Sequence, residues 1–309
     1  MQEQPHSIRG LALANVAVML FGLAGVLGKI SALPSPLIVL GRVLFASITL
    51  TIIALSQRIP VRPRSGRDGL LLIGQGLLLA LHWTAFFQSI NVSNVAIGLL
   101  SFSSFPLFTA LLEPLLLRQR PSLLQIIAAL LILPGIYLLV PSFSLENQIT
   151  LGIAWGLLAG ATFALLSVGN RGLGRHYSSV TLSLYQTGVA TIATLPMLFF
   201  FPTPLLGQPK TLLVLLLLGI FCTALAHTLF ISSMRHITAQ LASLLASLEP
   251  VWGILFGALL LHEIPSGTTL IGGLIILCAT CLPALATFPH SRTKPDLLRS
   301  TPEKRTTQK

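Results

Sequence analysis

Ten apolar segments, each about long enough to cross a membrane as a helix, constrain this chain most strongly. Crossing the hydrocarbon takes about 20 mostly apolar residues. A mean hydropathy of +0.86 with 9% charged residues does not describe a water-soluble globular protein. The sequence therefore predicts an all-α polytopic membrane protein with ten transmembrane helices. The predicted spans are Ile8–Ile30, Pro36–Ser56, Gly69–Ile90, Val95–Leu117, Ser122–Val140, Leu151–Asn170, Val180–Phe201, Thr211–Ser233, Ala239–Leu261 and Gly267–Thr287.

The basic residues predict how these helices are oriented. The net charge of +11 could indicate a nucleic-acid partner, but the Lys and Arg residues lie in short loops and in the C-terminal tail. Such residues are enriched in the cytoplasmic loops of membrane proteins. With a cytoplasmic N-terminus, sixteen of them fall inside, and only Lys29 and Lys210 fall outside. We therefore expect cytoplasmic N and C termini in a bacterial inner membrane, a basic disordered tail over 288–309, and no nucleic-acid partner.

The two halves of the chain repeat one another. Positions 82–135 align without a gap with 226–279 after a shift of 144, which brings Ser103 opposite Ser247 and Pro106 opposite Pro250. A shift of 142 gives a weaker match near the start of each half. The repeats cover 8–140 and 151–287, with five spans in each. An odd number of spans inverts the second copy relative to the first, a plan common among secondary transporters.

A motif marks the fourth helix of each copy. It runs from Pro250 to Glu263 in the second copy and from Pro106 to Gln119 in the first. On these motifs the chain resembles the EamA-type permeases of the drug/metabolite transporter superfamily, whose fourth helices usually end in Leu-Leu-Leu-Gly-Glu. The resemblance covers residues 8 to 287 and implies a ten-helix permease. The chain departs from the pattern at Gln119, which replaces the acid, and at His262, which replaces the glycine.

Ionisable residues inside the predicted spans are candidates for function, because each costs about 2.5 to 3.5 kcal/mol near a helix centre. Glu249 lies near the middle of its span, and Pro250 beside it cannot donate a backbone bond and would free the carbonyl of Ala246. Two roles are open for Glu249. It faces a substrate cavity or carries a coupling proton, or it is a neutral acid buried in helix packing through Gly253 and Gly257.

Two roles are also open for each of the other candidates within the predicted spans. Arg42 aligns with Gln186 and would bind either a carboxylate-bearing substrate or backbone carbonyls. His82 and His227 would either shuttle protons or fill packing positions. Glu113 lies near the cytoplasmic end of its helix, where a local ion pair or snorkelling is favoured over a transport role.

Aromatic side chains complete the candidate site. Trp83, Tyr137, Trp155, Tyr185 and Trp252 would line a cavity for a flat or amphipathic solute or anchor the helices at the interface. The candidate substrate-binding or coupling residues are Glu249, Pro250, Arg42, His82, Trp83, Pro106, Tyr185, Gln186, His227, Ser243, Ser247 and Trp252.

Sequence motifs argue against an enzyme. The chain contains neither HExxH nor the phosphate-binding GxxxxGK[ST], so we expect no metal, no cofactor and no nucleotide site. We predict a secondary transporter of a small, amino-acid-like or amphipathic metabolite. It would act as an exporter by alternating access, driven by a solute or proton gradient, as a monomer or homodimer among membrane lipids. The alternative is a non-transporting scaffold or a channel-like protein.

Overall fold

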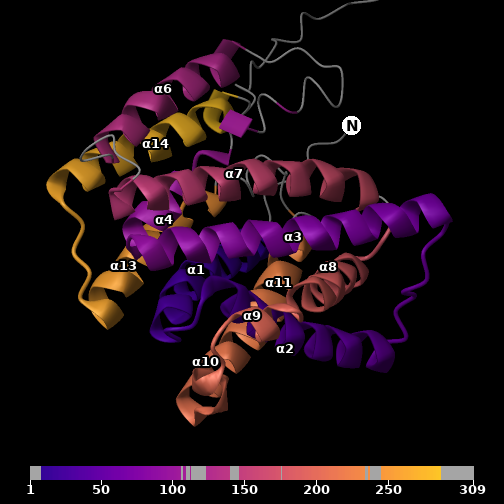
Figure 1. Cartoon of the computed structure of the whole chain (residues 1–309). Coiled ribbons are helices and arrows are strands. Elements are labelled where there is room, and N and C mark those ends of the chain that lie inside the picture. The colour runs from indigo at the N-terminus through magenta and orange to yellow at the C-terminus, as the bar shows by residue number, and fades with distance from the viewer. Residues whose placement is uncertain are drawn as a thin grey trace, which may run out of the picture.

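The computed structural model is built from helices and describes residues 8–105, 107–108, 112, 123–139, 146–174, 176–233, 236 and 245–286 (Figure 1). Six helical stretches in these ranges are long and apolar enough to cross a membrane. The all-helical membrane fold is therefore confirmed, whereas the number of ten crossings and the cytoplasmic termini stay predictions. The elements are α1 (Ile8–Ile30), α2 (Ser35–Ser56), α3 (Gly66–Val92), α4 (Val95–Phe102), α6 (Leu123–Leu139), α7 (Gln148–Leu173), α8 (Ser179–Thr194), α9 (Met197–Phe200), η1 (Pro204–Gly207), α10 (Pro209–Gly219), the π-helical turn η2 (Ile220–Leu225), α11 (Ala226–Ser233), α13 (Glu249–Leu261) and α14 (Gly267–Ala286).

Short polar breaks between the apolar segments become helix caps. The side chains of Ser65, Asn94, Asn147 and Ser178 each accept a hydrogen bond from a backbone N–H in the first turn of the following helix. Capping satisfies N–H groups that have no partner within the helix. The positions at which the apolar segments begin are therefore determined locally, and they agree with the predicted spans to within a few residues.

Equivalent helices of the two sequence copies pack in equivalent pairs. Helix α1 of the first copy packs on α13 of the second, just as α7 of the second copy packs on α4 of the first. In the same way α3 of the first copy packs on α7, and α11 of the second copy packs on α1. Helices α2 and α8, and likewise α6 and α14, pair elements that hold the same place in each copy (Figure 1). This exchange is what a pseudo-two-fold axis between two copies would produce.

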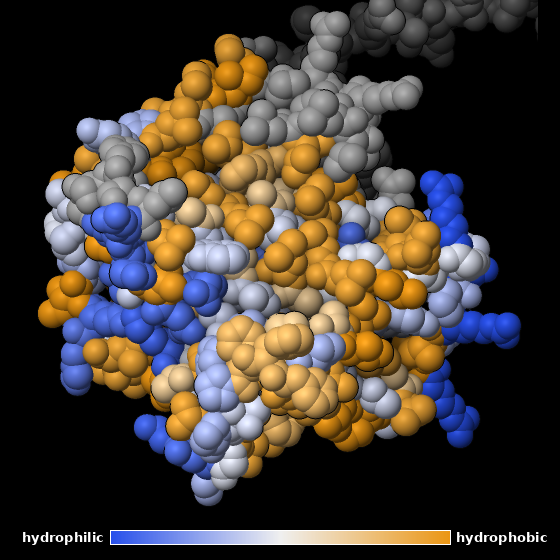
Figure 2. All heavy atoms as spheres, viewed as in Figure 1, coloured by the Kyte–Doolittle hydropathy of each residue, from blue (hydrophilic) through white to orange (hydrophobic). Residues whose placement is uncertain are grey.

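The surface has an apolar middle between polar margins. Figure 2 shows orange side chains across the middle of the visible face and blue ones gathered toward its left and right sides. Large apolar residues such as Ile52, Leu70 and Leu213 are exposed. Such a band would be costly in water and is suited to contact with lipid.

The fourth helix of each copy is broken, and the prediction of two unbroken spans is wrong in this respect. Helix α4 ends at Phe102, and a turn at Ser103 and Ser104 follows. Helix α13 begins at Glu249 after a turn at Ser247 and Leu248, which is 144 residues further on. The hydroxyls of Ser103 and Ser104 donate to backbone carbonyls of α4, a competition that weakens the helix locally.

The seventh predicted span is also divided. Helix α8 ends at Thr194, and α9 begins at Met197 beyond Pro196. Proline lacks the N–H that a continuous helix needs and collides with the preceding turn. The predicted span Val180–Phe201 therefore holds two helices that a turn at Leu195 and Pro196 joins, and together they form one apolar stretch of membrane length.

Helices α1 and α13 approach closely because two glycines meet at their crossing. A Cβ atom on Gly22 would lie 2.7 Å from the backbone nitrogen of Gly253 and 2.9 Å from the carbonyl oxygen of Glu249. Small residues allow backbones to come this near in a membrane. The crossing holds the beginning of α13, and with it Glu249, against the first copy.

We predict that Gly22→Ala destabilises the folded protein by about 1 to 3 kcal/mol, because the added methyl group meets backbone that cannot rotate away. The measurement is thermal unfolding in detergent. Gly74→Ala is the matched control, since a Cβ there meets nothing within 4 Å. An equal loss of stability in the two variants would contradict the close crossing.

Candidate functional site

A buried arginine lies at the centre of the candidate site. Arg42 on α2 is 2% exposed, and its Nε donates to the hydroxyl of Thr223 at 3.0 Å. Its Nη2 donates to the carbonyl oxygen of Cys222 at 3.3 Å. Both partners belong to η2, where the Thr223 hydroxyl also donates to the carbonyl of Leu218, five residues earlier. The π-helical turn therefore supplies two acceptors to the buried guanidinium, and such turns are frequent at functional sites.

Aromatic rings enclose the same guanidinium. Its central carbon lies 4.0 Å from the ring centroid of Trp83 and 5.3 Å from that of Phe87. The Trp83 ring meets His227 edge to face at 5.4 Å, and His227 meets Phe21 at 5.4 Å. A desolvated cation over an aromatic face gains about 2 kcal/mol. Side chains from α1, α2, α3 and α11 thus converge around Arg42.

Glu249 of the second copy lies at the beginning of a helix and not, as predicted, within one. The sequence placed it in the middle of a continuous helix, with Pro250 opening a gap in the hydrogen bonding. In the structure Glu249 and Pro250 form the first turn of α13, where proline is compatible with the helix. Glu249 is half-buried at the N-terminus of α13, a position that favours an acidic residue, and it lies within electrostatic range of Arg42.

His82 connects two helices at the edge of the cluster. Its Nδ1 lies 2.9 Å from the carbonyl oxygen of Ala159 on α7. A carbonyl only accepts, so Nδ1 carries the proton. The ring packs against Phe102 at 5.5 Å and Phe163 at 5.3 Å. These contacts favour the packing role for His82 over the proton shuttle.

A narrow cleft lies beside the Arg42 cluster. It is lined by Leu50, Leu79, Trp83, Ser183, Gln186, Thr187, Thr223 and His227. The Ser183 hydroxyl is buried and has no hydrogen-bond partner within the described residues. Gln186 donates its amide to the side-chain oxygen of Asn170 at 2.6 Å. The cleft therefore combines Trp83 and two leucines of the first copy with polar groups of the second copy.

Several sequence-predicted candidates lie away from this cluster. Tyr185 packs against a separate apolar cluster that contains Leu173. Trp252 stacks on Phe256 with ring centroids 6.1 Å apart, and Tyr137 is 62% exposed. Ser247 is buried in the turn before α13. The remaining candidates, Pro106, Glu113 and Ser243, lie outside the described residues.

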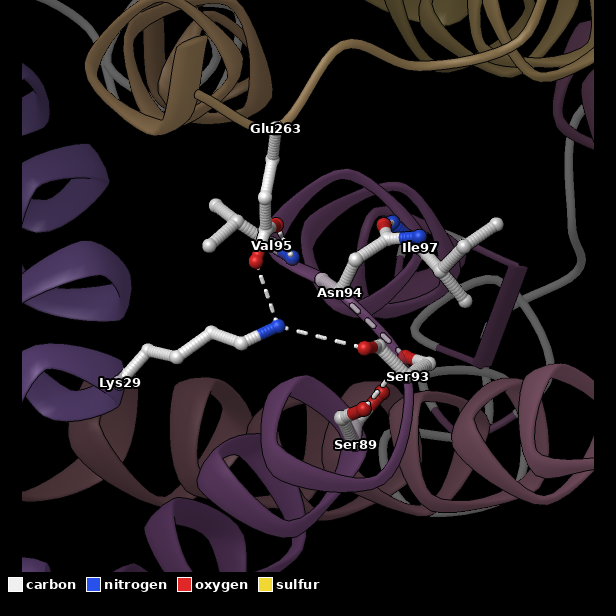
Figure 3. A network of polar contacts seen from close by, with 7 residues as sticks. All are labelled: Lys29, Ser89, Ser93, Asn94, Val95, Ile97 and Glu263. Carbon is white, nitrogen blue, oxygen red and sulfur yellow. Dashed lines mark hydrogen bonds and ion pairs between the residues drawn. The ribbon is translucent and has the colours of Figure 1, made fainter. Parts of the chain in front are cut away.

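Sequence reasoning missed Thr223 and Ser183, because it considered ionisable and aromatic residues in the spans and, among the hydroxyls, only those of Ser243 and Ser247. A second polar network, which lies at the C-terminal ends of α1 and α13, was missed as well (Figure 3). Lys29 Nζ lies 2.6 Å from Glu263 Oε1 and donates to the carbonyl of Ser93 at 3.2 Å. The backbone N–H of Val95 donates to Glu263 Oε2 at 3.0 Å.

An unusual backbone conformation brings Glu263 into this network. His262 closes α13 in the left-handed region with a φ of 55°, and the N–H of Glu263 donates to the carbonyl of Gly257. Glycine is the usual residue at such a helix end. The position is the one at which the chain departs from the Leu-Leu-Leu-Gly-Glu pattern.

A third set of polar contacts joins the α2–α3 connection and the start of α3 to the α7–α8 connection. Tyr177 accepts a hydrogen bond from the backbone N–H of Arg64 at 2.8 Å and donates to Asp68 Oδ2 at 2.7 Å. Arg64 also contacts the His176 ring nitrogen at 3.0 Å. Both polar margins of the molecule therefore carry contacts between the two sequence copies.

Comparisons with known proteins agree with a transporter. The sequence model of the EamA-like transporter family matches residues 8–140 and 150–284. An uncharacterized transporter of Archaeoglobus fulgidus is 27% identical over 217 residues, 70% of this chain and 77% of that protein. An uncharacterized transporter of Helicobacter pylori is 27% identical over 289 residues, 89% of this chain and 94% of that protein.

Two further comparisons extend this likeness. The pseudopaline exporter CntI of Pseudomonas aeruginosa is 24% identical over 213 residues, 68% of this chain and 72% of that protein. One solved crystal structure has a TM-score of 0.64 at 20% identity and covers 90% of this chain and 96% of its own, which shows a shared fold. The family and these relatives indicate a non-enzymatic, multi-pass protein of the inner membrane.

We predict that Thr223→Val destabilises the protein by about 1 to 3 kcal/mol, because it leaves the Arg42 Nε buried without its acceptor. Thermal unfolding in detergent measures the effect. Thr51→Val removes an exposed hydroxyl that donates to its own helix and should change little. If Thr223→Val were as stable as that control, the hydrogen bond from Arg42 to Thr223 would not contribute to the stability of the protein.

His262→Gly should raise the midpoint of thermal unfolding. A left-handed conformation costs a residue with a Cβ roughly 1 to 2 kcal/mol, and glycine avoids this cost. The same substitution at His236, whose backbone is not among the positive-φ residues, serves as the control. A lower midpoint for His262→Gly than for the parent protein would show that the imidazole stabilises this end of α13 by other contacts.

Proposed function

The chain belongs to the EamA-like transporter family, and on that premise we propose that it carries a small metabolite by alternating access between two inverted five-helix repeats. The proposal includes ten crossings with both termini in the cytoplasm, which the distribution of Lys and Arg residues supports. It also includes the repeat boundaries 8–140 and 151–287. The symmetric pairing of helices supports an exchange of conformation between the copies.

The observation that carries the proposal is that Arg42 of the first copy is buried against the π-helical turn of the second copy, with Glu249 of the second copy within electrostatic range. Each of the two residues lies next to an irregular backbone segment, η2 for Arg42 and the turn before α13 for Glu249. Irregular backbone at membrane depth is tolerated where protein or a cavity surrounds it. A solute charge or a proton that competes for either member would change how the two copies attract one another.

In this proposal Glu249 is the coupling or substrate-facing acid, and Arg42 is its fixed positive partner. The cleft with Ser183, Gln186, Trp83 and His227 is too narrow for a water molecule in this conformation, so in this proposal it would have to widen before a solute binds beside Arg42. A carboxylate suits the guanidinium and a flat or aliphatic body suits the aromatic rings, which favours an amino-acid-like or amphipathic solute. Outward transport is supported by the exporter among the relatives.

A scaffold or a channel would not need this arrangement. The test is a metabolite profile of medium and cytosol from cells that overproduce or lack the protein, followed by flux measurements with each candidate solute in reconstituted vesicles. We expect one solute to accumulate against a gradient in a pH-dependent manner. Flux no greater than in empty vesicles across a broad solute panel would refute the carrier.

We predict that Glu249→Gln abolishes proton coupling or turnover while the protein still inserts into the membrane. The amide keeps the size of the side chain but neither holds the negative charge nor takes up the proton. Flux at several pH values in vesicles measures the effect, with Glu146→Gln, an exposed acid before α7, as the control. Parental flux and pH dependence in Glu249→Gln would exclude this role.

A further inference from the structure

We infer that Lys29, Glu263 and the backbone of Ser93 and Val95 form an outer latch that holds the non-cytoplasmic end of the carrier closed. The inference rests on the proposed alternating access, in which that end must open and close. The latch joins α1, the α3–α4 connection and the end of α13 (Figure 3). It therefore ties the second sequence copy to the first at one margin of the molecule.

Both oxygens of one carboxylate take part. Glu263 Oε1 contacts Lys29 Nζ at 2.6 Å, and Oε2 accepts the N–H of Val95 at 3.0 Å. Lys29 in turn donates to the Ser93 carbonyl at 3.2 Å. Charge-assisted hydrogen bonds are stronger than neutral ones. A single side chain from α13 thus holds two points of the first copy, and its withdrawal would release both.

The latch is partly shielded but can still be reached by water. The Lys29 and Glu263 side chains are 25% and 26% exposed, so salt screens their attraction less than that of a fully exposed pair. A cavity of about 150 Å³ opens beside Glu263 and is lined by Asn94, Ala96, Glu263, Ile264 and Pro265. Water in this cavity could solvate the charges when the pair separates, which keeps the latch reversible.

The contacts beneath the latch are of another kind. A Cβ on Gly253 would meet Leu99 of α4 and the carbonyl of Gly22 on α1, and a Cβ on Gly257 would meet Val95. These contacts depend on close packing and have little directionality. The latch therefore supplies directional polar bonds at a crossing that is otherwise held by small and apolar residues.

The sequence repeat indicates that the latch has no equivalent ion pair at the repeat-related position of the molecule. A shift of 142 brings Lys29 opposite Arg171, and a shift of 144 brings Glu263 opposite Gln119. Gln119 lies outside the described residues, but a neutral amide does not form an ion pair. The second copy thus contributes an acid to the outer end, whereas the corresponding position of the first copy has none. Opening at this margin would have to break an ion pair that the repeat-related position cannot form.

Thiol labelling tests the latch without any solute. Val95→Cys is introduced after Cys222, Cys278 and Cys281 have been replaced by alanine, because the Val95 side chain is 1% exposed and keeps its N–H when it is changed. A membrane-impermeant thiol reagent is added outside intact cells. We expect slow labelling with the native latch, and labelling on the order of tenfold faster after Glu263→Gln or Lys29→Gln, because a charged pair and its hydrogen bonds are lost.

The charge swap Lys29→Glu with Glu263→Lys restores the ion pair but not the hydrogen bonds to Ser93 and Val95, so it should label at a rate between those of the parent protein and of the single variants. Lys210→Gln removes an exposed lysine from the start of α10 and should leave the rate unchanged. Parental labelling rates in both single latch variants would overturn the inference and leave the transport proposal intact. Conversely, faster labelling in the latch variants of a protein that shows no flux would support the latch while refuting the carrier.

Discussion

The cost of an unpaired polar group in hydrocarbon controls this structure. Every segment that crosses the apolar band must satisfy its own backbone, so these segments are helical, and Ser or Asn side chains cap the starts of α3, α4, α7 and α8. The same cost determines how Arg42 is held. A guanidinium that is 2% exposed needs acceptors, and the π-helical turn η2 provides a hydroxyl and a carbonyl beside it, while Trp83 covers its face.

Departures from symmetry between the two copies coincide with the polar contacts. Arg42 corresponds to Gln186 and Glu249 to Phe105, so a positive and a negative charge of the interior come from different copies. The broken fourth helices are common to both copies, at Ser103 and at Ser247. The repeat therefore supplies a shared framework of paired helices and helix breaks. Charged residues that are present in just one of the two copies make the two ends and the middle of the molecule different from one another.

Three polar regions connect the copies at different levels of the structure. The interior holds Arg42 and Glu249, one margin holds the outer latch, and the other margin holds Tyr177 between Arg64 and Asp68. The surfaces between these regions are largely apolar or made of small residues. A change of partner at one polar region can therefore be transmitted by movement of whole helices, since packed helices tend to shift as units.

The sequence by itself determined the fold class, the transporter family and most helix starts, because apolar length, capping residues and the repeat are local or periodic signals. It also identified Arg42, His227 and Glu249 as candidates from the cost of burying them, and Trp83 as an aromatic residue that would line a cavity. Tertiary structure decided that Trp83 lies between Arg42 and His227, that Glu249 begins a helix, and that Tyr185 and Trp252 have ring contacts and packing of their own. It also decided that Lys29 meets Glu263 across 234 positions of the chain, since contacts between distant segments depend on how helices pack and leave no periodic trace in the sequence.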